Sequence, residues 1–153
     1  SSHLNTIFSQ LDQINPGEDT QLGNVLHEMA DRIKKRGLVI LISDLFDDFD
    51  AIIGGLKHFR YNKQEVIVFH ILDRQELNFN FNTRTRFKDI ETGELITTEP
   101  WQIRTSYKDL VLEFQDKYRK QCRKRLIDYI PLFTDQDLDI ALSQYLRKRE
   151  KLG

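Results

Sequence analysis

Four carboxylates follow an apolar run in the first third of the chain. The run Leu38 to Ser43 ends on Asp44, and Asp47, Asp48 and Asp50 come soon after it. Carboxylates gathered at the end of a buried strand could hold magnesium (Mg²⁺), because hard divalent cations prefer oxygen ligands. A metal held there would suit a phosphoryl-transfer or nuclease-like enzyme. The simpler alternative is that these acids cap the following helix and favour its positive N-terminal end.

Other reactive side chains add little to a catalytic reading. Asp73 ends a second apolar run and could join Asp44, but the sequence has no glycine-rich phosphate loop, Ser-His-Asp set or obvious general base. His70 lies within that apolar run with no second His or Cys nearby, which favours a core histidine over a metal ligand. Cys122 falls on the apolar side of a helical pattern, where a free thiol behaves as a small hydrophobe.

Apolar periodicity predicts an alternation of helices and strands. Two continuous apolar strands joined by a helix predict a parallel crossover. Pro131 lacks a backbone donor, which places the last strand at a sheet edge. The predicted helices cover about 4–14, 19–36, 48–59, 100–126 and the segment after Thr134, and the predicted strands cover 38–43, 66–72 and 128–133. Residues 79–98 predict a β-hairpin that turns at Gly93. The fold class is therefore α/β, a three-layer open, mainly parallel sheet with helices on both faces and a small hairpin insertion.

The same periodicity predicts which side chains face the core. The run 38–42 is apolar at every position, which is typical of a strand covered on both faces. Helical spacing predicts inward-facing residues in the three longest helices. These are Leu22, Val25, Leu26, Met29 and Ile33; then Ile103, Tyr107, Leu110, Val111, Phe114, Tyr118, Cys122 and Leu126; and finally Leu138, Ala141, Leu142, Tyr145 and Leu146.

Composition excludes several classes of partner. The chain has 153 residues, 23 basic against 24 acidic, and a formal charge of -1, so nothing steers it as a whole toward nucleic acid or an anionic membrane. The basic residues between 117 and 125 alternate with apolar ones, as on a solvated helix face. No run is long enough for a membrane span, and a single cysteine suits a reducing compartment. We expect a cytoplasmic location, although a longer, membrane-associated protein could contain this chain, which begins without Met.

Three stretches carry a resemblance to a known family. They are Arg36 to Asp48 (RGLVILISDLFDD), Glu65 to Asp73 (EVIVFHILD) and Arg86 to Glu94 (RFKDIETGE), and the region Cys122 to Tyr129 adds to them. The chain resembles the bacterial family called domain of unknown function fifty-eight over nearly its whole length. Members of that family accompany MoxR-type AAA ATPases, and the resemblance implies that their C-terminal half has a von Willebrand factor type A fold.

The type A resemblance also implies a metal-ion-dependent adhesion site. Such a site takes an Asp-x-Ser-x-Ser loop, a Thr before a later helix and an Asp after the following strand. Thr20 matches the second element and Asp44 the third, but Asp-x-Ser-x-Ser does not occur in these residues. The resemblance thus implies an incomplete magnesium site. It also implies that residues 1–153 form a single domain that lacks its first strands and is an excerpt of a longer protein. Read without the resemblance, Thr20 is a helix cap.

Two function classes compete, and we favour a protein-binding module over an enzyme. The resemblance implies a MoxR-type AAA ATPase as the partner, recognised through the carboxyl edge of the sheet. The candidate partner-binding residues are Asp47, Asp48, Phe79, Phe81 and Phe87. If no upstream strand is present, the strand at 38–43 has an unpaired apolar edge. We therefore expect the isolated chain to form a homodimer or to lie beside an upstream segment.

Overall fold

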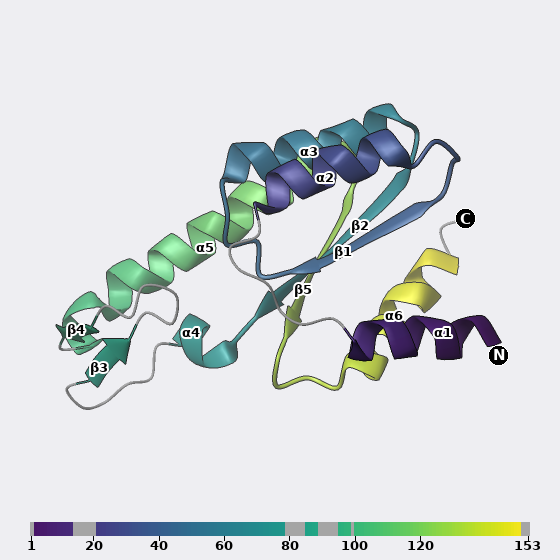
Figure 1. Cartoon of the computed structure of the whole chain (residues 1–153). Coiled ribbons are helices and arrows are strands. Elements are labelled where there is room, and N and C mark those ends of the chain that lie inside the picture. Colours follow the sequence, from purple (N-terminus) through teal and green to yellow (C-terminus); the bar gives the residue numbers. More distant parts are fainter. Residues whose placement is uncertain (1, 14–20, 79–84, 89–94, 99, 151–153) are drawn as a thin grey trace.

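Helices and strands alternate along the chain in the computed structural model, which describes residues 2–13, 21–78, 85–88, 95–98 and 100–150 (Figure 1). In chain order the elements are α1 (Ser2–Asp12), α2 (Leu22–Arg32), β1 (Leu38–Ser43), α3 (Phe49–Tyr61), β2 (Glu65–Leu72), α4 (Arg74–Asn78), β3 (Thr85–Lys88), β4 (Leu95–Thr98), α5 (Pro100–Lys124), β5 (Asp128–Phe133) and α6 (Leu138–Glu150). The α/β class is confirmed. Among the described helices, none has an apolar stretch that could cross a lipid bilayer.

Three of the strands form a parallel sheet in the order β1-β2-β5. Leu41 of β1 pairs with Val68 of β2, which pairs in turn with Tyr129 of β5. The central strand is β2, whose side chains from 66 to 70 are all buried. The edge position predicted for β5 from Pro131 is confirmed. A parallel crossover, with α3 between β1 and β2, is confirmed as well.

A separate antiparallel pair, β3 with β4, confirms the predicted hairpin. Its backbone register places Phe87 opposite Ile96. The turn between these strands, with Gly93, lies outside the described residues.

One face of the sheet is covered by α2, α3 and the C-terminal half of α5, and Figure 1 shows α2 and α3 above β1 and β2. The core there is a single apolar cluster. Its buried members are Leu26, Ala30, Leu45, Ile52, Ile53, Leu56, Phe59, Val66, Val68, Tyr118, Cys122 and Ile127. The buried Cys122 confirms the prediction made for that thiol.

Glycines bring α2 and α3 unusually close together. A Cβ added at Gly23 would lie 2.4 Å from Ala51 Cβ, and one added at Gly55 would lie 2.5 Å from Leu26 Cβ. Because neither position has room for a methyl group, the helices pack almost backbone to backbone. The inward face of α2 combines Leu26 with two small residues, Gly23 and Ala30. The prediction that Val25 and Met29 face the core is wrong, since both are exposed.

The connection from α2 to β1 is held by a buried amide. Gln64 Nε2 donates hydrogen bonds to the carbonyl oxygens of Lys35 (2.8 Å) and Ile33 (3.3 Å). Ile33, the C-cap of α2, has an extended backbone conformation (φ −83°, ψ 95°), so α2 ends at Arg32. The prediction that this helix continues to 36 is wrong for that reason.

The opposite face of the sheet is covered only in part. Leu142 and Tyr145 of α6 pack against Ile67 and Phe69 of β2 and against Leu132 of β5. Side chains of β1 alternate between partly buried and exposed. The prediction that 38–42 is covered on both faces is therefore wrong among the described residues, and within the described sheet β1 lies at an edge.

Several predicted core positions lie at the surface because their helices end or turn away. Helix α5 ends at Lys124, and Leu126 adopts a left-handed conformation (φ 56°) with its side chain exposed. Leu110 of α5 is exposed, and so are Leu138 and Leu146 of α6. The predictions for these four residues are wrong.

Candidate functional site

The acidic loop, residues 44–48, begins where β1 ends and runs into α3. Asp44 Oδ1 accepts a hydrogen bond from the Phe46 amide (3.2 Å), and Ser43 Oγ accepts one from the Leu45 amide (3.0 Å). Asp48 is the N-cap of α3, because its Oδ1 accepts from the Ala51 amide at 2.7 Å. Two of the predicted site carboxylates therefore support the local backbone, as the capping alternative predicted.

A buried anchor holds this loop against the core. Leu45 adopts a left-handed conformation (φ 61°), and its side chain is fully buried. The Tyr118 hydroxyl donates a hydrogen bond to the Leu45 carbonyl oxygen at 3.3 Å. A β-carbon makes this backbone region costly, so the burial and the hydrogen bond are what maintain it. The loop is thus a fixed structure whose exposed side chains, Asp44 and Phe46 among them, point away from the core.

Asp47 connects the acidic loop with the start of α2. The pKa of its carboxyl is lowered, first by the backbone amide of Asp48; desolvation opposes this change, and the amides of Leu22 and Gly23 add smaller lowering contributions. Amides at a helix N-terminus stabilise a negative charge in this way. The structure therefore brings the acidic loop to the beginning of α2. Thr20, the other predicted metal ligand, lies outside the described residues.

A buried histidine lies behind the acidic loop. His70 of β2 is fully buried, its Nδ1 is 2.5 Å from the Tyr129 hydroxyl, and its ring meets Phe114 edge to face. Burial lowers the pKa of His70, and the backbone and carboxylate of Asp44 partly oppose that change. Within the described structure Nε2 has no hydrogen-bond partner of normal geometry. The core position predicted for His70 is confirmed, although only one of its two nitrogens is satisfied.

Asp73 belongs to a different part of the sheet edge. Its Oδ1 accepts from the Gln75 amide (2.6 Å) and its Oδ2 from the Thr134 hydroxyl (3.1 Å). An ion pair joins Arg74 Nε to Asp135 Oδ2 at 2.5 Å. An open pocket of about 310 Å³ is lined by Asp73, Arg74, Gln75, Asn78, Thr134 and Asp135. Asp44 is not among these residues, so the structure gives no support to a shared Asp44 and Asp73 site.

The described donors do not fit a complete magnesium site. Over the described segments, no group of three or more His, Cys, Asp or Glu side chains is placed to hold a metal ion. Asp44 contributes one carboxylate, already bonded to a backbone amide. Mg²⁺ is usually held by one or two carboxylates together with waters, so Asp44 alone, with Thr20 outside the described residues, does not define a complete site.

The structure describes only some of the predicted partner-binding residues. Asp47 and Asp48 are exposed on the acidic loop. Phe79 and Phe81 lie outside the described residues. Phe87 lies on β3, but only its backbone is described.

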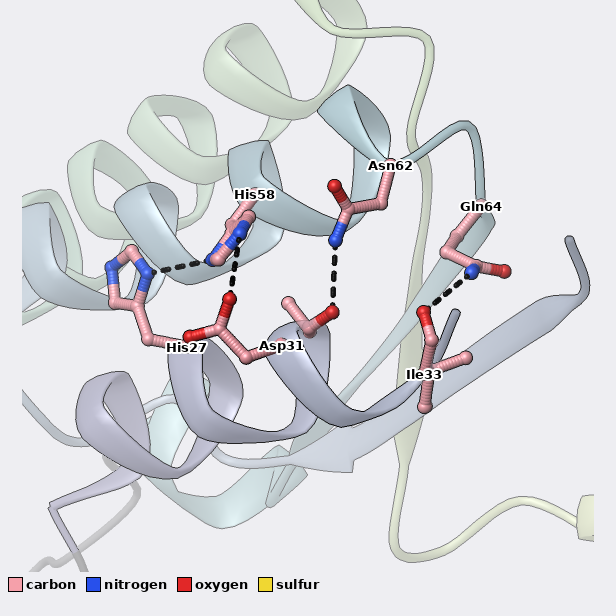
Figure 2. Close-up of polar contacts among 7 residues, drawn as sticks. His27, Asp31, Ile33, His58, Asn62 and Gln64 are labelled. Atoms are coloured by element: carbon pink, nitrogen blue, oxygen red, sulfur yellow. Dashed lines mark hydrogen bonds and ion pairs between the residues drawn. The ribbon is translucent and has the colours of Figure 1, made fainter. Parts of the chain in front are cut away.

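Sequence reasoning missed a polar cluster on the outer side of α2 and α3. His27 and Asp31 of α2 lie beside His58 of α3, and Figure 2 shows the three side chains converging. His27 and Asp31 are four residues apart, which places them on one side of a helix. The spacing of His27 and Asp31 was the one signal in the sequence for this cluster. His58 could not be assigned to it, because α3 approaches α2 through the glycine contacts described above.

These observations define an α/β protein with a short parallel sheet, in which β1 is an edge strand among the described residues, and with an acidic loop at the carboxyl end of β1. A comparison with protein families matches residues 1–117 to the family described as "Protein of unknown function DUF58". The chain belongs to that family. Comparison with curated proteins gives no match, and comparison with solved structures gives none.

Proposed function

We propose that this chain is a protein-interaction module whose binding surface is the outer face of β1. That face consists of Leu38, Ile40 and Ile42, which are 49%, 50% and 65% exposed. Their side chains alternate with Val39 and Leu41, which pack on the core. The exposed apolar face at an unpaired strand is the single observation that carries the proposal, because contiguous exposed apolar surface marks sites of protein association.

The proposed partner is a MoxR-type AAA ATPase, as the family resemblance suggests. Our proposal includes the finer architecture, a three-layer von Willebrand factor type A-like domain with at most a partial metal-ion-dependent adhesion site. A partner that covers β1 would also approach the acidic loop, since that loop begins directly at the end of the strand. Asp47 and Asp48 would then supply exposed charge at the rim of an apolar contact.

The test is direct binding between the purified chain and the MoxR-type ATPase of the same organism. We expect the double variant Ile40→Ser/Ile42→Ser to lose binding. Leu112→Ser, which removes an equally exposed side chain from α5, is the matched control and should bind normally. Equal loss in both variants, or no binding by the original chain, would overturn the proposal.

Sedimentation equilibrium separates the ATPase from a second copy of the chain. A dimer that dissociates in the double variant but persists in Leu112→Ser would show that another copy covers β1, and the ATPase assignment would then fail. A monomer that binds the ATPase supports the assignment.

Metal titration tests the enzyme alternative and the partial site. Mg²⁺ and Mn²⁺ are titrated calorimetrically into the chain, with Asp44→Ala and Thr20→Ala alongside. Tight binding that both variants lose, together with phosphatase or nuclease turnover, would favour a metal-dependent enzyme. We expect neither, because Asp44 is engaged by the loop backbone.

A further inference from the structure

Two imidazoles from neighbouring helices face each other on the surface formed by α2 and α3. His27 Nδ1 lies 3.2 Å from His58 Nδ1, and the two ring centroids are 5.4 Å apart with a tilt of 46° (Figure 2). His27 is exposed and the side chain of His58 is 26% exposed. The pair is therefore open to an ion from solvent, and its two Nδ1 atoms lie within hydrogen-bond distance of each other.

A carboxylate on the far side of His58 sets which nitrogen can act as a ligand. His58 Nε2 lies 3.5 Å from Asp31 Oδ1. A proton on Nε2 is favoured beside that carboxylate, which leaves a lone pair on Nδ1, directed at His27. Carboxylates that hold the second nitrogen of a metal-binding histidine play this orienting role in metal sites.

We propose that His27 and His58 form a binding site for a borderline divalent transition metal, with Zn²⁺ as the reference ion. Imidazole nitrogens suit Zn²⁺, Ni²⁺ and Cu²⁺ far better than Mg²⁺. Two nitrogens at about 2.0–2.1 Å from a tetrahedral zinc ion are about 3.3 Å apart. The separation of 3.2 Å between the two Nδ1 atoms matches that spacing. Water completes the coordination, and Asp31 acts as a positioning residue.

The surrounding helix contact preorganises the pair. A Cβ at position 54 would lie only 3.1 Å from His27 Nε2, so Gly54 makes room for that ring. Asn62 Nδ2 donates to the Ala30 carbonyl oxygen at 2.8 Å and fixes α3 against α2 one turn further along (Figure 2). The metal would join two helices that are already locked together. This site is independent of the β1 surface, so it stands or falls separately from the proposed function.

The test is calorimetric titration of ZnCl₂ into the 153-residue chain, with MgCl₂ as the comparison ion. We expect saturable binding of one Zn²⁺ per chain, no comparable heat from Mg²⁺, and a higher thermal midpoint with zinc. His27→Gln and His58→Gln should each weaken zinc binding by about 100-fold or more, because each removes one of the two protein ligands, and Asp31→Asn by about tenfold, because its carboxylate only positions His58. His3→Gln, on the exposed surface of α1, is the matched control and should bind as the original chain does.

Circular dichroism and the metal-free thermal midpoint of each variant show whether the fold is kept. A structural histidine pair alone would shift the metal-free midpoint in the variants and give no saturable zinc heat in the original chain. That result would overturn the site. Zinc binding of unchanged affinity in folded His27→Gln or His58→Gln would overturn it too, since the metal would then lie elsewhere.

Discussion

Two neighbouring residues of β1, Leu41 and Ile42, should differ in their response to substitution by Ser: one substitution should mainly lower stability and the other should mainly weaken binding. Ile42 points away from the core and is 65% exposed, whereas Leu41 is partly buried and packs on the main apolar cluster. Replacement of each by Ser in turn therefore separates a loss of stability from a loss of binding within one strand.

The exposed fraction of Ile42 sets the size of each effect. Full burial of an Ile side chain contributes about 1.5–3 kcal/mol. Roughly a third of that is already realised in the folded chain, so Ile42→Ser should lower the free energy of unfolding by about 0.5–1 kcal/mol. A partner that covers the rest gains about 1–2 kcal/mol, so the same substitution should weaken binding by about 5–30-fold. Leu41→Ser should lower the free energy of unfolding by about 2 kcal/mol or more.

Urea unfolding measures the first quantity, and biolayer interferometry with the ATPase measures the second. The expected pattern is a stable, weakly binding Ile42→Ser variant and a destabilised Leu41→Ser variant whose folded fraction binds normally. If Ile42→Ser were as destabilising as Leu41→Ser, the outer face of β1 would be covered in the isolated chain, and our reading of it as a free surface would be refuted.

Three further predictions concern the core and its titratable groups. Gly23→Ala should destabilise the fold, because overpacking costs about 1–3 kcal/mol and exceeds the gain of about 1 kcal/mol in helix propensity. Gly37→Ala is the control in urea unfolding, because a Cβ at that position would meet only ordinary contacts. A Gly23→Ala variant that is more stable than the original chain would contradict the close contact between the helices. Burial lowers the pKa of His70, so as the pH falls the unfolded chain takes up a proton on this residue before the folded chain does. The free energy of unfolding should therefore be at its full value above about pH 6.5 and fall below that pH by at most about 1.4 kcal/mol per pH unit. In unfolding curves measured at several pH values, His70→Gln should flatten this dependence, and an unchanged slope would contradict the prediction. Burial raises the pKa of the Cys122 thiol to about 11, so iodoacetamide at pH 8 should modify this residue only after the chain is unfolded in urea. Mass spectrometry detects the modification, and modification of the native chain would disprove the burial of Cys122.

Most of the fold could be predicted from local patterns. Apolar runs located β1 and β2, and the missing amide of Pro131 placed β5 at an edge, because both signals act within a few residues. Helix faces were harder to predict. Helix α2 turns its glycines toward α3, and no periodicity of large apolar residues records a contact made through Gly23 and Gly55.

The candidate site was predictable only as a set of residue types. The sequence indicated that Asp44, Asp47 and Asp48 follow a strand, but it left open whether they bind metal or cap the backbone. Whether these carboxylates bind metal or cap the backbone depends on the positions of Leu45 and of the Leu22 and Gly23 amides, which tertiary packing determines. The His27 and His58 pair depends entirely on the distance between two helices, which could not be predicted from local sequence patterns.

The acidic loop also has a mechanical consequence. Asp48 holds the first turn of α3 through the Ala51 amide, and the amides of Leu22 and Gly23 stabilise the charge of Asp47 at the first turn of α2. Two adjacent residues thus support the starting ends of both helices that cover this face of the sheet. Any molecule that binds these carboxylates would therefore contact the first turns of both helices, which pack closely against each other.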